Sequence, residues 1–111
     1  MPNRPTRWYS NKQEKAVAKA VNGKTVPNSG AIRFGAGDVT TDQFLIEAKT
    51  VTNPQKTFTI RKDWLEKNRE ESFAMGKSYS ALVFDFGDGE RHYVIDEKLF
   101  KILVDYLQSE D

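Results

Sequence analysis

The sequence predicts an α/β (α+β) fold, in which helices pack against one mixed β-sheet of about five strands. Stretches with helical periodicity alternate along the chain with stretches of strand-like alternation, in the order helix, strand, hairpin, helix, strand pair, helix. The 111 residues include 7 Phe, 4 Tyr and 2 Trp, more aromatic side chains than a chain without a packed core carries. The length allows one domain of this kind.

The N-terminal part of the chain is expected to form a basic arm followed by a helix. Residues 1–10 are basic and interrupted by proline, so we expect an extended arm there and a single domain over residues 11–108. Ser10 or Asn11 would cap the first helix, and Gly23 would end it.

One side of this first helix is apolar and also carries an acid. Val17, Ala18 and Val21 form the apolar stripe, because residues three and four apart share a helix face. Glu14 lies three residues before Val17 and therefore on the same side. An acid in such a place is most often a boundary residue that pairs with a lysine. It is also a candidate site residue.

The remaining elements follow from alternation and from turn residues. Asn, Gly and Pro mark the breaks, and Gly87-Asp88-Gly89 is expected to turn one strand into the next. The expected order is a short strand at 24–26, a loop at 27–37, a hairpin-like pair at 39–41 and 44–51, an extended piece at 57–60, a helix at 61–75, strands at 80–86 and 91–95, and a last helix after Asp96.

The two later helices carry large apolar residues. Trp64, Leu65 and Phe73 are expected to face inward from the helix at 61–75. The last helix, capped by Asp96, has the strongest helical periodicity in the chain. Its apolar face, and Trp64 with Phe73, fit either core packing or a dimer interface. The apolar residues of the last helix are Leu99, Phe100, Ile102, Leu103, Tyr106 and Leu107.

Composition excludes several classes of function. The chain has no Cys, which excludes disulfide scaffolds, thiolate metal sites and cysteine nucleophiles, and its single histidine, His92, is too few for a histidine-based metal site. No apolar run is long enough to cross a bilayer and no signal sequence is recognisable, so a cytoplasmic protein is expected. Residues 1–69 hold 13 basic and 6 acidic residues, whereas residues 70–111 hold 4 and 10. This asymmetry suggests contact with nucleic acid, unless the two halves interleave in space.

The most informative segment joins Asp38 to the strand at 44–51. Side chains alternate along a strand, so Glu47 and Lys49 point the same way from a segment that otherwise looks buried. Asp38 opens the preceding strand and would come alongside Glu47 if the turn lies near residues 41–43. Two carboxylates and an ammonium group would then meet at one edge of the sheet.

Such a cluster suits divalent-metal chemistry on phosphate esters. Two hard oxygen ligands with several waters satisfy Mg²⁺ or Mn²⁺, and a lysine beside the ion can orient a water molecule. The alternative is a Glu47–Lys49 surface pair on an edge strand, which contributes at most about 1 kcal/mol.

Asp38, a gap of eight residues, and Glu47-Ala48-Lys49 on an apolar strand resemble the PD-(D/E)XK nuclease superfamily, which has the restriction-endonuclease-like fold. The resemblance covers about residues 10–65. Within the superfamily, the order of motifs is similar to that of archaeal and phage-type Holliday junction resolvases: Glu14 on the first helix, Ser29-Gly30 in the loop, Gly37-Asp38, and Ile46-Glu47-Ala48-Lys49.

The resemblance implies a role for each residue of the cluster. Asp38 and Glu47 would ligate Mg²⁺ or Mn²⁺, with the backbone carbonyl of Ala48 as a third protein ligand. Lys49 would position the attacking water. Glu14 would complete the acidic cluster, directly or through water.

Outside the cluster, the resemblance is less complete. Ser29 would contact the scissile region or the DNA backbone. Gly37 stands where many members of the superfamily have proline. The basic residue that usually precedes the serine has no certain counterpart, and Lys24 is the best match.

The expected function is therefore hydrolysis of DNA phosphodiester bonds by a junction resolvase of phage type, acting on branched DNA as a homodimer without a small-molecule cofactor. A nicking or flap nuclease, a non-catalytic DNA-binding module and a structural domain are the alternatives. Trp8 or Tyr9 could stack on a base or dock on the domain. The basic residues expected to meet phosphates are Arg4, Arg7, Lys12, Lys15, Lys19, Lys24, Arg33, Lys56, Arg61 and Lys62.

Overall fold

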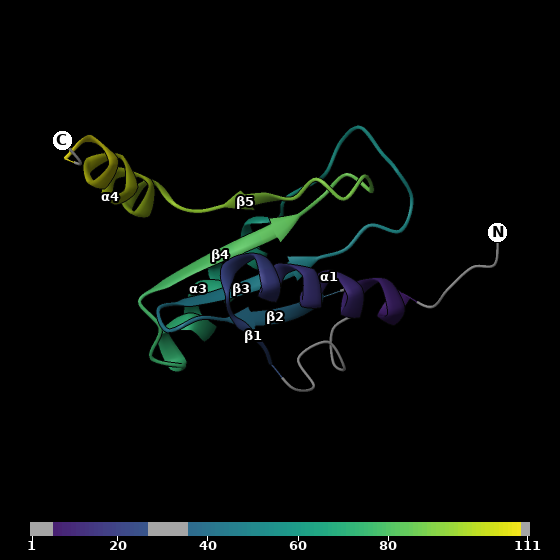
Figure 1. The fold of residues 1–111 in the computed structure, drawn as a ribbon, viewed down its shortest axis with the longest axis horizontal. Helices are drawn as coiled ribbons and strands as arrows, with labels where there is room; N and C mark the ends of the chain where they lie inside the picture. Colours follow the sequence, from purple (N-terminus) through teal and green to yellow (C-terminus); the bar gives the residue numbers. More distant parts are fainter. Residues whose placement is uncertain (1–5, 27–35, 110–111) are drawn as a thin grey trace.

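The structure is a computed structural model that describes residues 6–26 and 36–109. It confirms the expected α+β fold, with a five-stranded mixed sheet and, in the described part of the chain, three helices (Figure 1). In chain order the elements are α1 (Thr6–Val21), β1 (Lys24–Thr25), β2 (Ala36–Thr40), β3 (Phe44–Lys49), α3 (Lys62–Ala74), β4 (Tyr79–Phe84), β5 (His92–Val94) and α4 (Glu97–Gln108).

The five strands lie side by side in the order in which they occur in the chain. β2 and β3 form the expected hairpin, and the hydroxyl oxygen of Thr41 accepts a hydrogen bond from the backbone N–H of Phe44 in its turn. β3 and β4 run parallel, so the chain must cross over between them, and α3 lies in this crossover. β3 is therefore the central strand, paired on both sides.

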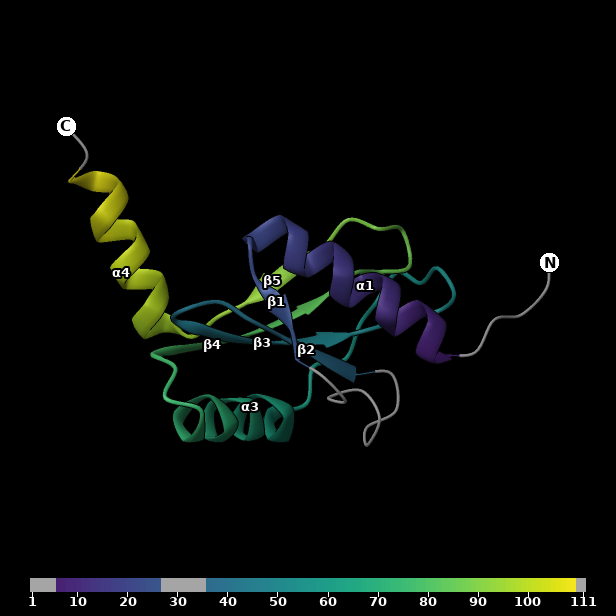
Figure 2. The same cartoon turned by 60° about the horizontal axis from the view of Figure 1, so that its bottom comes forward.

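Two helices cover opposite faces of the sheet, α1 on one side and α3 on the other (Figure 2). The core under α1 contains Val17 together with Val39, Ile46 and Val83 from three neighbouring strands, all at most 3% exposed. Because side chains alternate along each strand, the residues next to these in sequence point to the face that α3 covers. Asp38 and Glu47 are two of them.

α3 is attached to the sheet by polar side chains as well as by apolar ones. Asn68 is 1% exposed and donates its amide to the backbone carbonyl oxygen of Ala81 at 2.8 Å. The hydroxyl of Ser72 donates to the backbone carbonyl oxygen of Tyr79 at 2.9 Å. Trp64 and Leu65 are half-buried, as expected, but Phe73 is 85% exposed, so its predicted inward position is wrong. Ser72 takes the inward position, and Phe73 is turned about 100° away from it around the helix.

Three other predictions from the sequence are wrong: the extended arm up to residue 10, the cap at Ser10 and the extended piece at 57–60. The helix begins at Thr6, so the last residues of the expected arm are helical, and Ser10 is a buried helical residue and not a cap. In that first part of α1, Lys12 lies over the ring of Trp8, one helical turn away. No strand forms over residues 57–60; Phe58 instead stacks on Phe84, with ring centroids 4.3 Å apart.

α4 stands apart from the rest of the domain and leads away from the sheet (Figure 2). Its predicted cap is confirmed, because Oδ1 of Asp96 accepts a hydrogen bond from the backbone N–H of Leu99 at 2.9 Å. Leu99 is buried, but most of the apolar face beyond it is exposed. In the part of the chain that the structure describes, no helix combines the length and the apolar character needed to span a membrane.

Candidate active site

The pairing of β2 with β3 places Asp38 directly opposite Glu47. Residues opposite each other on neighbouring strands have Cβ atoms about 5 Å apart and point to the same face of the sheet. Both side chains are buried, Asp38 at 8% exposure and Glu47 at 0%. The position of the turn at residues 41–43, on which this pairing depended, is as the sequence predicts.

Lys49 lies beside this pair of carboxylates. Its Nζ is 2.9 Å from Oε2 of Glu47, and its side chain is 13% exposed. The expected convergence of two carboxylates and one ammonium group is therefore present in the fold. The alternative of a surface pair on an edge strand is wrong, because β3 is the central strand and Glu47 is fully buried.

Trp64, in the first turn of α3, holds the ammonium group from the other side. Nζ of Lys49 lies 4.1 Å from the centroid of the indole ring, within the range of a cation–π interaction. The ring belongs to an aromatic cluster that includes Phe58 and Phe84. The sequence analysis predicted that Trp64 faces inward but did not assign it to the site. The feature that could have indicated this role is its position in the first turn of the helix that follows the strand carrying Lys49.

Glu14 lies on the other layer of the domain. It is 6% exposed on α1, and α1 and α3 cover opposite faces of the sheet (Figure 2). Asp38 and Glu47 point to the α3 side, because their neighbours Val39 and Ile46 belong to the core under α1. The neighbouring Gln13 donates its amide to the backbone carbonyl oxygen of Lys49 at 2.6 Å, so this turn of α1 is fixed at the end of β3 that carries the candidate site. The predicted contribution of Glu14 to the acidic cluster stays a prediction.

Ala48 and the serine loop complete the predicted set. Ala48 is paired with Gly37 on one side and Val83 on the other, so its backbone belongs to the interior of the sheet. Its carbonyl as a metal ligand stays a prediction. Ser29 and Gly30 lie outside the described residues, as do Arg4 and Arg33, and for Arg7 the structure describes the backbone alone.

Most of the residues predicted to contact DNA that the structure describes lie on the elements around the site or along α1. Lys12 of α1 and Lys56 of the segment after β3 are exposed. The N-terminal end of α1 and the segment after β3 lie at the end of the domain toward which β3 runs (Figure 1), and this segment leads to the start of α3. Arg61 and Lys62 are exposed at that start, and Lys15 and Lys19 follow along α1. Lys24 is different: it pairs with Thr40 at the other end of the hairpin, next to the 41–43 turn, and its assignment as the phosphate contact before the serine gains no support from this position.

The carboxylate pair suits a divalent cation of the Mg²⁺ class. Within residues 6–26 and 36–109, no three His, Cys, Asp or Glu side chains form a set that could hold a metal ion. Asp38 and Glu47 offer two hard oxygen donors, which is the usual protein contribution to a Mg²⁺ site that completes its octahedron with water and phosphate oxygens. Two carboxylates held opposite each other repel, and a bound cation relieves that repulsion. The residues present therefore fit Mg²⁺ or Mn²⁺.

Comparisons with protein-family models, with curated proteins and with solved structures find no match to this chain. What the site does must therefore be argued from its own geometry.

Proposed function

We propose that this protein is a divalent-metal-dependent DNA endonuclease that hydrolyses phosphodiester bonds, with a four-way junction as its substrate. The observation that carries the proposal is the placement of Asp38 opposite Glu47, with the ammonium group of Lys49 beside them. A buried pair of acids with one adjacent lysine is an expensive arrangement for a structural strand, because burying like charges costs free energy. It is a useful one for holding a cation against a phosphate.

Each side chain has a separate task in this proposal. Asp38 and Glu47 hold the Mg²⁺ or Mn²⁺ ion, and that ion, when bound, neutralises phosphate charge and lowers the pKa of a water molecule. Lys49 donates a hydrogen bond that orients the attacking water and stabilises the charge that develops on the phosphate oxygens. Glu47 and the ring of Trp64 keep Nζ of Lys49 in place, at 2.9 and 4.1 Å.

The surface around the site supports a polyanionic substrate. The start of α1 and the segment after β3 lie at the end of the domain toward which β3 runs (Figure 1), and this segment leads to the start of α3. The exposed basic residues of these elements are Lys12, Lys56, Arg61 and Lys62. Contacts of this kind bind the phosphate backbone without reading bases. They suit an enzyme that recognises the shape of DNA. Resolution of a four-way junction needs two symmetric cuts, so we propose a homodimer.

Replacing Trp64 with leucine should slow cleavage without weakening DNA binding. The variant loses the ring face under Nζ of Lys49, and a contact of this kind contributes about 0.5–2 kcal/mol, which corresponds to roughly a tenfold lower kcat. Trp64→Phe keeps an aromatic face and should recover most of the rate. The measurement is single-turnover cleavage beside DNA affinity by fluorescence anisotropy. Equal loss of rate in both variants, or loss of affinity alone, would show that Trp64 does not position Lys49.

Replacing Asp63 with asparagine should strengthen DNA binding. Arg61 donates to the carboxylate of Asp63 at 2.9 and 3.2 Å, and this hydrogen-bonded pairing lowers the pKa of Asp63 and raises that of Arg61. Because the pKa of Asp63 is lowered, its carboxylate stays ionised at neutral pH. The ion pair with Arg61 is lost only when the pH falls far enough to protonate Asp63. In Asp63→Asn the guanidinium group is free to contact a phosphate.

We expect the variant to bind duplex DNA more tightly, with a slope of log affinity against log salt that is steeper by about one. Anisotropy titrations at several salt concentrations measure this slope. Glu70→Gln, which removes an exposed acid from the same helix, is the matched control. If both variants shift the slope equally, net charge and not Arg61 is responsible.

The test of the proposed function is cleavage of synthetic four-way, flap, nicked, duplex and single-stranded DNA in Mg²⁺, with Glu47→Gln as the control. Paired, symmetric cuts at the junction support the resolvase. Cuts at flaps or nicks alone would make the protein a nuclease of replication or repair. Binding without cleavage would make it a DNA-binding module, and neither binding nor cleavage would leave a structural domain.

A further inference from the structure

Of the elements that the structure describes, α4 carries the most exposed large apolar side chains. Five of its side chains are between 42% and 69% exposed: Phe100, Ile102, Leu103, Tyr106 and Leu107. Side chains at these positions lie within an arc of about 160° of the helix circumference, because successive residues are about 100° apart. Monomeric proteins rarely leave a contiguous apolar patch of this size uncovered. Such a surface indicates that α4 binds a partner.

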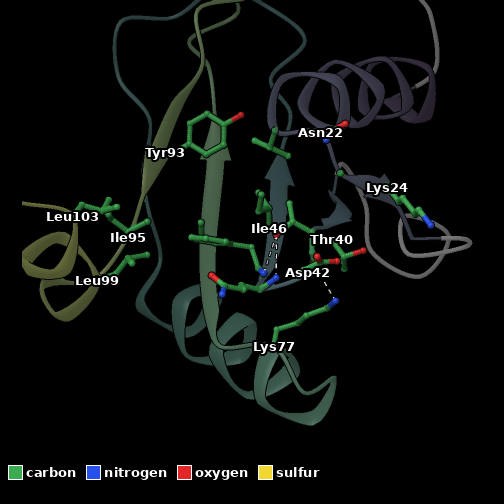
Figure 3. Close-up of a pocket in the computed structure, with 16 residues that line it drawn as sticks. Asn22, Lys24, Thr40, Asp42, Ile46, Lys77, Tyr93, Ile95, Leu99 and Leu103 are labelled. Atoms are coloured by element: carbon green, nitrogen blue, oxygen red, sulfur yellow. Dashed lines mark hydrogen bonds between the residues drawn. The ribbon is translucent and has the colours of Figure 1, made fainter. Parts of the chain in front are cut away.

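The same molecule carries an open groove beside the base of α4, on the face of the sheet that α1 covers in part. The groove has a volume of about 940 Å³. Figure 3 shows Ile46 on its floor, Tyr93 toward one end, and Leu99 and Leu103 of α4 along one side. Lys24, Asp42 and Lys77 lie along the rim, and Nζ of Lys77 donates to the carbonyl oxygen of Thr41 at 2.7 Å. The groove is thus apolar inside with a net positive rim.

We propose that two copies of this chain exchange their α4 helices, each helix lying in the groove of the other copy. α4 cannot fill its own groove beyond its first turns, since Leu99 and Leu103 form one wall and the rest of the helix leads away from the domain (Figure 2). In the dimer, the groove of each chain receives α4 of the other chain, so both apolar surfaces are covered. The arrangement is self-complementary and closes with twofold symmetry.

The surface area is sufficient for a stable dimer. The exposed apolar side chains of α4 offer on the order of 500 Å², since a large aromatic side chain alone covers about 150–250 Å² when it is buried. Two helices and the two grooves that receive them would bury on the order of 1,500 Å², which is the size of a standard specific interface.

The proposed interface lies on the face of the sheet that α1 covers in part, whereas Asp38, Glu47 and Lys49 point to the α3 side, so the interface leaves the candidate site uncovered. This interface would join the two chains of the homodimer proposed above. It is argued from the exposed face of α4 and from the groove, and not from the residues of the nuclease site. Its test measures molecular mass and no cleavage, so it can fail while the nuclease proposal stands, or stand while the nuclease proposal fails.

Sedimentation equilibrium of the full-length chain tests the exchange. We expect a mass of twice 12.7 kDa at micromolar concentration. Tyr106→Glu places a charge on the apolar face of α4, and Tyr93→Glu places one in the groove; both side chains are partly exposed, at 62% and 41%, so both variants should fold. Each should raise the dimer dissociation constant by roughly a hundredfold or more, because an unpaired charge is costly to bury. Lys101→Glu, on the polar face of α4, should leave the dimer intact.

A mixture of the Tyr106→Glu and Tyr93→Glu chains gives a second readout. A mixed pair keeps one helix and one groove without substitution, so it should associate more tightly than either variant alone. Circular dichroism confirms that the variants are folded. A wild-type chain that is monomeric throughout the concentration range would overturn the proposal. So would a Tyr93→Glu chain that dimerises like the wild type, because α4 would then bind somewhere other than the groove.

Discussion

Replacing Lys49 with methionine is expected to lower the rate of DNA cleavage about a thousandfold while DNA binding persists. Methionine fills a similar volume but cannot donate a hydrogen bond to the attacking water or to the phosphate oxygens. Removing a single donor of this type from a catalytic site typically costs about 10²–10³ in rate. Single-turnover cleavage of a labelled four-way junction in Mg²⁺, beside anisotropy of the same DNA, measures both properties.

Lys56→Met is the matched control, since Lys56 is an exposed basic residue in the segment that follows β3. It should weaken binding slightly and leave the single-turnover rate at saturation unchanged. If Lys49→Met instead cleaves at the wild-type rate, Lys49 is a structural partner of Glu47 and has no part in the chemistry.

Replacing Glu47 with glutamine is expected to abolish cleavage, with a loss of more than a thousandfold. Glutamine keeps the shape of the buried side chain but removes the charge that both holds the cation and fixes Nζ of Lys49 at 2.9 Å. Since one substitution removes two contributions, its effect should equal or exceed that of Lys49→Met. The double variant Glu47→Gln, Lys49→Met should then be little worse than Glu47→Gln alone, because residues that act as a unit are non-additive.

The same cleavage assay measures this loss, and circular dichroism establishes that the buried substitution is tolerated. Cleavage by Glu47→Gln at more than about a tenth of the wild-type rate would contradict the role given to this carboxylate. Additive losses in the double variant would show that Glu47 and Lys49 act separately.

Local pattern predicts the centre of this fold well. The alternation of Phe44, Ile46 and Ala48 fixed which side chains of β3 face α1, and the turn residues fixed the register that sets Asp38 opposite Glu47. A slip of one residue would have sent one of the carboxylates to the other face. The carboxylate pair could therefore be predicted from the sequence, because it depends on one hairpin alone.

Features that depend on contacts between distant elements could not be predicted from the sequence in the same way. The contact of Trp64 with Lys49 joins α3 to β3, and no local pattern specifies it. Phe73 matched a helical stripe, but Ser72 makes the hydrogen bond to the sheet. Glu14 shares the buried side of α1, and periodicity cannot say on which layer that side lies.

The start of α1 and the exposure of α4 show two further limits of local pattern. The sequence near Trp8 looks like an arm because prolines precede it, yet it is helical in the structure, with Ser10 buried. The apolar periodicity of α4 predicts a helix with one buried face. It does not distinguish a face covered by the same chain from a face covered by a second copy.

The central claim is that Asp38 and Glu47 together hold one divalent cation, and direct Mn²⁺ binding tests it. Calorimetric titration of Mn²⁺ into the wild-type protein should give one site per chain, and Asp38→Asn and Glu47→Gln should each abolish it. Asp85→Asn is the matched control, since Asp85 is also 8% exposed but lies at the end of β4, where its carboxylate accepts a hydrogen bond from Gly87; this variant should bind Mn²⁺ like the wild type. Mn²⁺ binding that survives in either Asp38→Asn or Glu47→Gln would contradict the account.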